Sequence, residues 1–493
     1  MIKSKSIEII CTFSKTEFKD FRKFIDSSYF NENKMLVKMY SLLKKYYPDF
    51  NSRVFTKENL YIKLYPGKKY NDGTMRKLLS ELQSLAENFL VHNAFDKKQE
   101  VRRNLIMLYE LDEKKLDRLF EMKHSELLEV LNREGSFDDD YFMNNFEAVV
   151  ASLNFNLGKG RAGFNPEQVL TELKKCATYL ICHSLITSLK LNQDIMVTVV
   201  SFDFDYKDTL AYKYIESLGD VQFLEHVKFY SPEYYPVAAI YYYRFMIASG
   251  KDDSDSYYQN MKKNILSTLH LFTRFEKYNL MLFLENSCDE KIHAGKDFNT
   301  ELHNVQNIML SKNLYTSIET DYFPLIRFRK FIRTAIALKK YKWTEDFIKD
   351  YIGKLPEEFR NSMYFYSHAL LSYEKKAFAE ALENVMKVKF ETYAIKYDVW
   401  ALKIKTQFEL NYIEQSFYTF DTLKHSIKND KESPEWMKTR FANFLNFFQL
   451  ILKLKAGDYV NKSNEEIRED ITSSAHTNEK KWLLEKLDNI QAG

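Results

Sequence analysis

Apolar residues along this chain recur every three or four positions, which is the spacing of one buried face of an α-helix. The clearest example runs from Tyr70 to Val91. Its apolar stripe consists of Met75, Leu78, Leu79, Leu82, Leu85, Ala86 and Phe89. Shorter segments with the same spacing follow Ser14 and occupy about 35–46 and 56–64. The pattern predicts an all-α protein.

Polar residues at the ends of these segments predict where helices begin and end. Ser14 and Glu17 form the S-x-x-E pattern of a capping box. Three later starts combine a capping side chain, a proline and an acid, which suit the first turn of a helix. They are Asn165-Pro166-Glu167, Ser231-Pro232-Glu233 and Ser433-Pro434-Glu435. Gly457 predicts the end of the helix that starts near Ser433.

The composition supports long helices joined by short loops. The chain of 493 residues has only 12 glycines and 8 prolines, the two residues on which turns depend most. It also has 34 tyrosines, 39 phenylalanines and 4 tryptophans. We expect these rings to fill the helix interfaces and, for surplus tyrosines, to line grooves.

Charge and a break in the pattern suggest two domains. Residues 1–100 contain 19 Lys and Arg against 12 Asp and Glu, whereas the remainder contains 53 against 57. The helical pattern is interrupted by the stretch REGSFDDD. We predict a basic N-terminal helical domain at 1–134 and a second helical domain at 135–493. The basic end is the one global hint of an anionic partner.

The C-terminal third contains a weak internal repeat. Phe378 is followed three positions later by the small residue Ala381. A shift of about 35 residues aligns Ser416 and Asp346 with Ala381; serine is tolerated at a small position, and aspartate violates it. This pattern resembles the tetratricopeptide repeat, which has a period of about 34 residues. Ala369 and Ala381 match the small positions at which its paired helices cross.

The resemblance is best at 360–390, with degenerate copies over 325–425. It implies an α-solenoid in which each helix pair buries its apolar face against the next pair. At about 35 residues a unit, residues 136–493 have room for roughly ten units. Such arrays curve, and their inner surface usually holds a protein or peptide partner. Residues 136–320 show helices of similar length but no common phase.

Residues 53–95 resemble the helix-turn-helix part of a winged-helix domain. A short helix, the basic turn PGKKYNDG and a longer helix with cations near its start follow one another. The matching residues are Leu60, Leu64, Lys68, Lys69, Arg76, Lys77, Leu79, Leu82 and Leu85. The wing of that family is a two-stranded hairpin; here one strand is possible at 89–95, and a second is missing. The resemblance implies nucleic-acid contact through Lys68, Lys69, Arg76 and Lys77; the alternative is a helical cap with solvated lysines.

Gly158, Gly160 and Gly163 form a literal G-x-G-x-x-G. A dinucleotide-binding fold needs a strand before this motif and an acid about 20 residues after it. The preceding residues instead have helical spacing, and His183 lies 20 positions after Gly163. We therefore predict a loop between two helices. Lys159 and Arg161 remain candidates for weak anion binding beside the next helix start.

The chain has no recognisable catalytic or metal-binding motif. Cys176, Cys182 and His183 lack the spacing of a zinc site and are expected in the core. The consecutive tyrosines Tyr241, Tyr242 and Tyr243 could stack on a peptide or a base at a groove edge, or fill the core. We expect no metal and no cofactor.

The sequence shows neither a signal-peptide pattern nor an apolar run of membrane-spanning length. We therefore predict a cytoplasmic, non-enzymatic interaction scaffold that binds a protein or peptide in the groove of helical repeats. The alternative is a nucleic-acid-binding regulator in which the N-terminal segment contacts the duplex and the repeats sense a partner. A hydrolase or transferase is the third possibility; it requires a pocket of clustered acids or histidines with perturbed pKa values.

Overall fold

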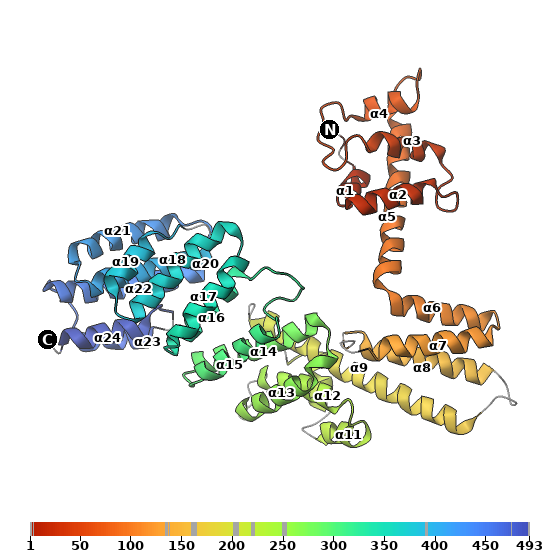
Figure 1. Ribbon diagram of the computed structural model, residues 1–493. Coiled ribbons are helices and arrows are strands. Elements are labelled where there is room, and N and C mark those ends of the chain that lie inside the picture. The colour runs from red at the N-terminus through yellow and green to blue at the C-terminus, as the bar shows by residue number, and fades with distance from the viewer. Residues whose placement is uncertain are drawn as a thin grey trace. The chain divides into compact units, whose positions relative to one another are not determined.

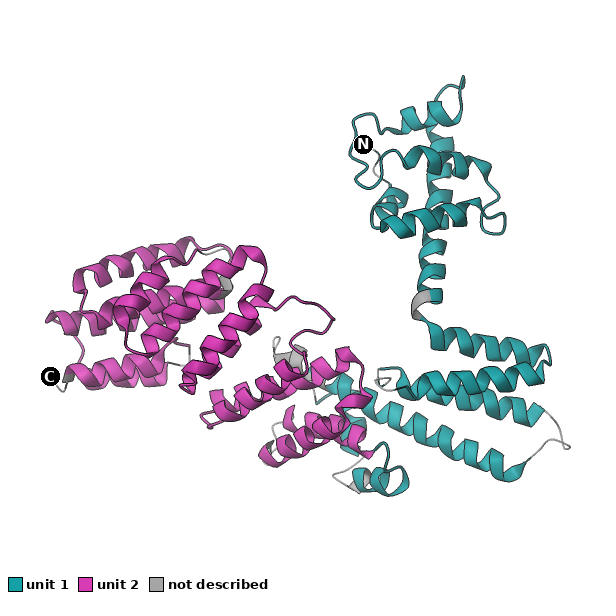
Figure 2. Ribbon diagram, viewed as in Figure 1, with its two compact units in different colours: residues 1–234 teal, residues 235–493 magenta. Residues whose placement is uncertain are grey.

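The structure is a computed structural model that describes residues 2, 4–133, 137, 139–158, 165–200, 207–217, 222–248, 254–389, 393–474 and 476–491. Over these residues it contains 24 α-helices and two short 3-10 helices, and no β-strand (Figure 1). The predicted all-α fold is therefore confirmed. Contacts divide the chain into two compact units, Met1–Tyr234 and Tyr235–Gly493 (Figure 2). This division falls after the predicted domain boundary at residue 135, which stays a prediction.

The first unit begins with a bundle of five helices. These are α1 (Lys5–Cys11), α2 (Lys15–Asp26), α3 (Lys34–Leu43), α4 (Lys57–Leu64) and α5 (Asp72–Lys98). The whole apolar stripe predicted on the long helix is buried. Phe89 on α5 packs against Phe13 and Phe21, with ring centroids 5.3 and 5.2 Å apart. The predicted possible strand at 89–95 is thus wrong: these residues continue α5, because its helical stripe is what fits the bundle core.

The rest of the first unit is a second group of helices. It comprises α6 (Glu100–Glu113), α7 (Asp117–Leu131), α8 (Tyr141–Gly158), α9 (Pro166–Val200), α10 (Leu210–Ser217) and α11 (Gln222–Tyr230). Both α6 and α7 pack on α8, and α8 packs on α9. The stacked rings of Phe120 and Phe155, 3.9 Å apart, join α7 to α8.

The second unit consists of helices that pack mainly on their neighbours in sequence. They are α12 (Tyr235–Ala248), α13 (Ser254–Thr268), η1 (Leu269–Leu271), α14 (Arg274–His293), α15 (Asn299–Ser311), α16 (Leu325–Ala337), α17 (Tyr341–Tyr351), η2 (Ile352–Lys354), α18 (Glu357–Glu374), α19 (Phe378–Met386), α20 (Tyr393–Glu409), α21 (Ile413–Asn429), α22 (Glu435–Ala456), α23 (Asn464–Ser473) and α24 (Lys480–Gln491). In addition, α18 contacts both α16 and α20.

Most of the predicted helix ends are confirmed. The capping box at Ser14 is present, Asn165 caps α9 through its side-chain oxygen, and Gly457 ends α22 in the left-handed conformation. The start predicted at Ser231 is wrong, because its amide still bonds to the Val227 carbonyl and so ends α11. Ser433 precedes α22 as predicted, but its hydroxyl donates to Asp430 and does not cap the helix.

One backbone geometry recurs in the second unit at the ends of α14, α15 and α22 and in three turns that join one helix directly to the next. Each of these three turns has a residue with positive φ, namely Lys339 at 55°, Lys376 at 63° and Asn411 at 59°. In each, the next amide donates to the carbonyl five positions earlier; the pairs are Lys340 to Ala335, Ala377 to Ser372 and Tyr412 to Gln407. This is the Schellman ending of a helix. The same bonds close the turn at Lys115 between α6 and α7.

These turns give a second way to align the helices that the sequence analysis compared by a shift of 35 residues. The helices that follow them start at Tyr341, Phe378 and Ile413, which are 37 and 35 residues apart. The equivalent of Ala381 is therefore Thr344, not Asp346 as a uniform shift of 35 suggested. Thr344, Ala381 and Ser416 are all fully buried, so the small position is kept in the three helices.

Candidate functional site

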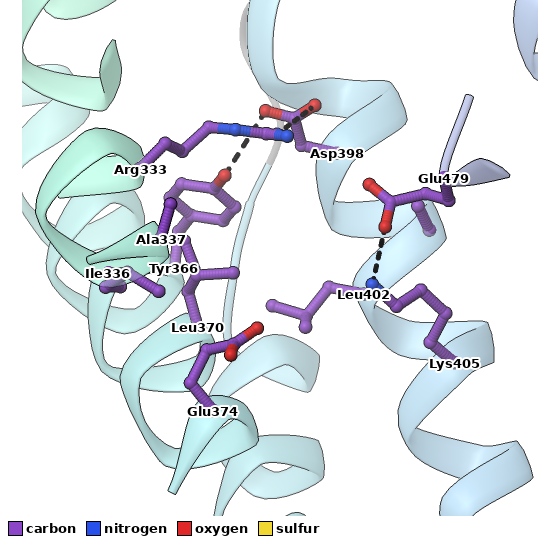
Figure 3. A pocket seen from close by; sticks show the side chains of 11 residues that line it. Arg333, Ile336, Ala337, Tyr366, Leu370, Glu374, Asp398, Leu402, Lys405 and Glu479 are labelled. Carbon is purple, nitrogen blue, oxygen red and sulfur yellow. Dashed lines mark hydrogen bonds and ion pairs between the residues drawn. The ribbon is translucent and has the colours of Figure 1, made fainter. Parts of the chain in front are cut away.

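A pocket of about 170 Å³ opens between α16, α18 and α20, next to the residue that precedes α24. Figure 3 shows side chains from these segments converging on it. Its lining consists of Arg333, Ile336, Ala337, Tyr366, Leu370, Glu374, Asp398, Ala401, Leu402, Lys405 and Glu479. Apolar side chains and five charged groups thus meet in one hollow, which makes it a candidate binding site.

Asp398 joins three helices at one end of the pocket. Its carboxylate, on α20, lies 3.0 Å from Arg333 Nη1 and accepts a hydrogen bond from the Tyr366 hydroxyl at 3.2 Å. Arg329, also on α16, donates to the same carboxylate. Burial by itself would raise the pKa of Asp398, but the two guanidinium groups outweigh it and hold the pKa below its usual value. The charge of Asp398 is therefore fully matched.

Lys405 and Glu479 form a second ion pair at the wall of the pocket. Lys405 Nζ lies 2.6 Å from Glu479 Oε2, and the attraction of Lys405 lowers the pKa of Glu479. The same ammonium group lies over the rings of Tyr373 and Trp482, 4.9 and 5.7 Å from their centroids. Cation–π contacts of this kind hold the lysine in place. This pair ties α20 to the start of α24.

Glu374, at the end of α18, differs from the other acids of the pocket. Its carboxylate has no hydrogen bond or ion pair with any described residue, and its side chain points toward Leu370 and Leu402 (Figure 3). Although the residue as a whole is exposed, desolvation raises the pKa of its carboxyl above the usual value, and Lys405 opposes the effect. Glu374 is thus the lining charge that the protein leaves unmatched.

The three consecutive tyrosines predicted at a groove edge lie on α12 and not in this pocket. Tyr241 is buried and donates to Glu276 Oε1 at 2.6 Å. Tyr242 is also buried, and the partly buried Tyr243 stacks on Tyr257 at 5.9 Å. Their burial agrees with the core-filling alternative. A role in a partner groove stays a prediction.

Two of the four cations proposed for nucleic-acid contact are paired with acids of their own helix. Arg76 Nε lies 2.6 Å from Asp72, and Lys77 Nζ lies 4.0 Å from Glu81. Lys68 lies over the ring of Tyr65, and Lys69 is exposed. A helix-turn-helix order of α4 and α5 is present, but residues 4–133 hold no strand that could form a wing.

A second hollow, of about 540 Å³, lies beside α5 and carries acids in place of cations. It is lined by Phe30, Asn31, Glu32, Asn33, Leu36, Glu81, Ser84, Leu85 and Asn88. Glu81 accepts a hydrogen bond from Asn33 at 2.5 Å. Glu32 and Glu81 offer a phosphate backbone no attraction here, and Glu81 already faces Lys77 at 4.0 Å. This face of the helix therefore gives no support to duplex binding.

The glycine motif joins two helices, as predicted. A helix, α8, ends at Gly158 where a dinucleotide fold has a strand, and α9 begins at Pro166. The anion-binding candidates Lys159 and Arg161 lie outside the described residues.

Cys176 and Cys182 were expected in the core, and the structure agrees. Cys176 and Cys182 are buried, and desolvation raises the pKa of both thiols, that of Cys182 to about 12. Such thiols stay protonated and unreactive at neutral pH. No group of three or more possible metal ligands occurs among the described residues. Within the same residues, no helix has the length and apolar character needed to cross a membrane.

Sequence reasoning did not find the pocket, although it found helices that form it. Arg333 and Glu479 are far apart in the chain, and neither belongs to a motif. The signal that could have pointed to buried acids nearby is the crowding of four cations on the short helix α16, namely Arg327, Arg329, Lys330 and Arg333. Comparison with known proteins adds no relative: no family model, curated protein or solved structure matches this chain.

Proposed function

We propose that α16 to α24 form a tetratricopeptide-like array and that the protein is a non-enzymatic scaffold. Its partner would be a protein or peptide segment held on the concave side of the array. The turns at Lys339, Lys376 and Asn411 support the array, because in each of them the next helix begins within two residues of the positive-φ residue. Each turn joins one of these helices to a following helix of the same or shorter length. Such a helix pair is the repeating unit that stacks in an α-solenoid.

The pocket carries the proposal. It is lined by the first helices of three consecutive pairs, α16, α18 and α20. In an array of stacked pairs these helices form the inner surface, where partners usually bind. Arg333 and Glu374 are exposed there and can be reached by a ligand.

Binding suits these residues better than catalysis. A general acid or base works best when its pKa lies near the working pH and its proton can reach the substrate. Asp398 and Glu479 have the opposite character, because their ion pairs lower the pKa of each; Glu374 has a raised pKa, but its carboxylate has no hydrogen-bonded partner among the described residues. The contacts of Asp398 and Glu479 join helices and present a fixed surface. We therefore propose recognition as the role of the pocket.

The contacts of the N-terminal cations favour the scaffold over the nucleic-acid-binding regulator. Lys57 and Arg76 both approach Asp72, at 3.7 and 2.6 Å. Cations that already have acid partners release fewer counterions when they meet a phosphate backbone. The alternative, a nucleic-acid-binding regulator, now depends on Lys68 and Lys69.

Affinity capture from the native host, followed by mass spectrometry, tests the scaffold. Ala337→Trp places a large ring at an exposed position of the pocket wall and should abolish capture of the partner. Ala177→Trp makes the same change at an exposed position of α9 and should leave capture intact. A partner set that is identical for both variants and the wild type would refute binding in the pocket.

A further inference from the structure

Three acids and two cations line the pocket, and a third cation, Arg329, reaches Asp398 from behind the lining. Asp398 is matched by Arg333, and Glu479 by Lys405. Glu374 is left over. A ligand that enters this hollow therefore meets one carboxylate that has no direct ion pair or hydrogen bond with a described residue, although Lys405 and Lys339 act on it from a distance. A cation placed there gains attraction without having to displace an internal partner.

The walls around Glu374 are apolar. Leu370 and Leu402 lie between Glu374 and the Arg333–Asp398 pair in Figure 3, and Ala337 and Ile336 complete the lining. A lysine or arginine side chain has matching chemistry, because its methylene stem covers apolar surface while its charged head stays with a polar group. The volume of about 170 Å³ is below the roughly 300–1,000 Å³ of sites that enclose drug-sized ligands. The hollow thus suits a single side chain.

We propose that this pocket holds one lysine or arginine side chain of the partner segment. The stem lies against Leu370, Leu402 and Ala337, and the charged head meets Glu374. Desolvation at Glu374 disfavours its ionised form, and an incoming cation reverses that penalty. The inference rests on the proposed scaffold function and names the chemistry that its groove selects.

A direct test uses small probes in place of the unidentified partner. N-acetyl-lysine-methylamide would be titrated into the full chain while the methyl resonances of Leu370 and Leu402 are followed. N-acetyl-norleucine-methylamide has a similar stem without charge, and N-acetyl-glutamate-methylamide carries the opposite charge. The lysine probe should shift both leucines with an affinity at least fivefold above either of the others. Equal shifts by the lysine and norleucine probes would overturn the inference.

Two variants at surface acids separate a specific contact from a general charge effect. Glu374→Gln keeps the shape of the side chain and should weaken the lysine probe about tenfold. Glu380→Gln makes the same change on α19, outside the pocket, and should alter the affinity by less than twofold. If both variants weaken the probe equally, the attraction comes from the overall field of the protein and the inference is wrong.

The capture experiment then distinguishes this inference from the function on which it rests. If Ala337→Trp loses the partner while Glu374→Gln retains it fully, the pocket binds a partner but does not select a cation, and the inference falls alone. If both variants lose the partner and the lysine probe binds, both statements hold. If neither variant loses it, the proposed function fails with the inference.

Discussion

At the residue scale, the left-handed positions of the turns stand out because this glycine-poor chain fills them with lysine and asparagine. Lys339 and Lys376 have φ of 55° and 63°, a conformation that costs a residue with a Cβ roughly 1–2 kcal/mol. Asn411 tolerates it better. The helix ends hold because the Schellman hydrogen bonds and the neighbouring packing outweigh this strain. The strain should be measurable by substitution.

Replacing Lys376 with glycine should stabilise the protein by about 0.5–1 kcal/mol, because relief of strain exceeds the backbone entropy that glycine adds to the unfolded chain. Thermal unfolding followed by circular dichroism measures the effect. Asn411→Gly should gain less. Lys424→Gly, in the interior of α21, is the control and should cost about 1 kcal/mol. Loss of stability in Lys376→Gly would show that the turn is not strained there.

His303 predicts a pH dependence of stability. Its ring, 1% exposed, packs edge-on against Trp343 at 4.7 Å. Desolvation, with a contribution from Lys340, lowers its pKa to about 4, against about 6.5 in an unfolded chain. The folded state therefore favours the neutral ring. The stability due to this ring is complete above pH 6.5 and is lost as the pH falls toward 4, by up to about 3 kcal/mol.

Thermal unfolding midpoints between pH 7.5 and pH 4 test this expectation. His303→Phe keeps a ring against Trp343 but cannot take up a proton, so its midpoint should fall less steeply over this range. His124 and His368, whose pKa values are also lowered by burial, account for a residual slope in the variant. A slope equal to that of the wild type would contradict the assignment to His303.

At the element scale, local chemistry predicted helix ends well where it was sufficient by itself. The Ser14 box, the Asn165 cap and the Gly457 stop need only a few adjacent residues. The helix start predicted at Ser231 was wrong because the backbone hydrogen bonds of α11 continue to the Ser231 amide. Residues 89–95 failed as a strand because burial of Phe89 in the bundle decides their conformation.

The contact of α16 with α20 depends on Asp398. Asp398→Asn leaves Arg329 and Arg333 without their counter-charge in a partly buried site. Breaking such a pair by removing one partner typically costs 3–5 kcal/mol, and we expect the loss here to be about 3 kcal/mol. Chemical denaturation followed by tryptophan fluorescence measures it. Asp421→Asn, at an exposed position of α21, is the matched control and should change stability by less than about 0.5 kcal/mol.

At the scale of the whole molecule, the sequence predicted the fold class but not the site. The spacing of apolar residues within one segment predicts that the segment is a helix, but it does not predict which other helices it packs against. The pocket instead joins Arg333 on α16 to Glu479 before α24, and their meeting depends on how successive helix pairs stack. A uniform shift along the sequence also misses differences in helix length: the helices that start at Tyr341 and Phe378 are 37 residues apart, not 35.

Nucleic-acid binding by the whole chain should be weak. We expect a 20-base-pair duplex to bind no more tightly than the roughly 10⁻⁴–10⁻⁶ M of non-specific contacts at physiological salt. Lys68→Ala combined with Lys69→Ala should change the measured affinity by less than twofold in fluorescence anisotropy. Tight binding that falls steeply with salt and with this double variant would favour the regulator over the scaffold.

In the function proposed for this protein, a partner segment lies in the hollow between α16, α18 and α20. Site-specific photo-crosslinking tests it most directly, with a benzophenone amino acid placed at Leu370 in the pocket or at the exposed Tyr418 of α21. In the native host, the account predicts a discrete crosslinked partner from position 370 and none from position 418. Crosslinks from position 418 alone, or the same products from both positions, would contradict it.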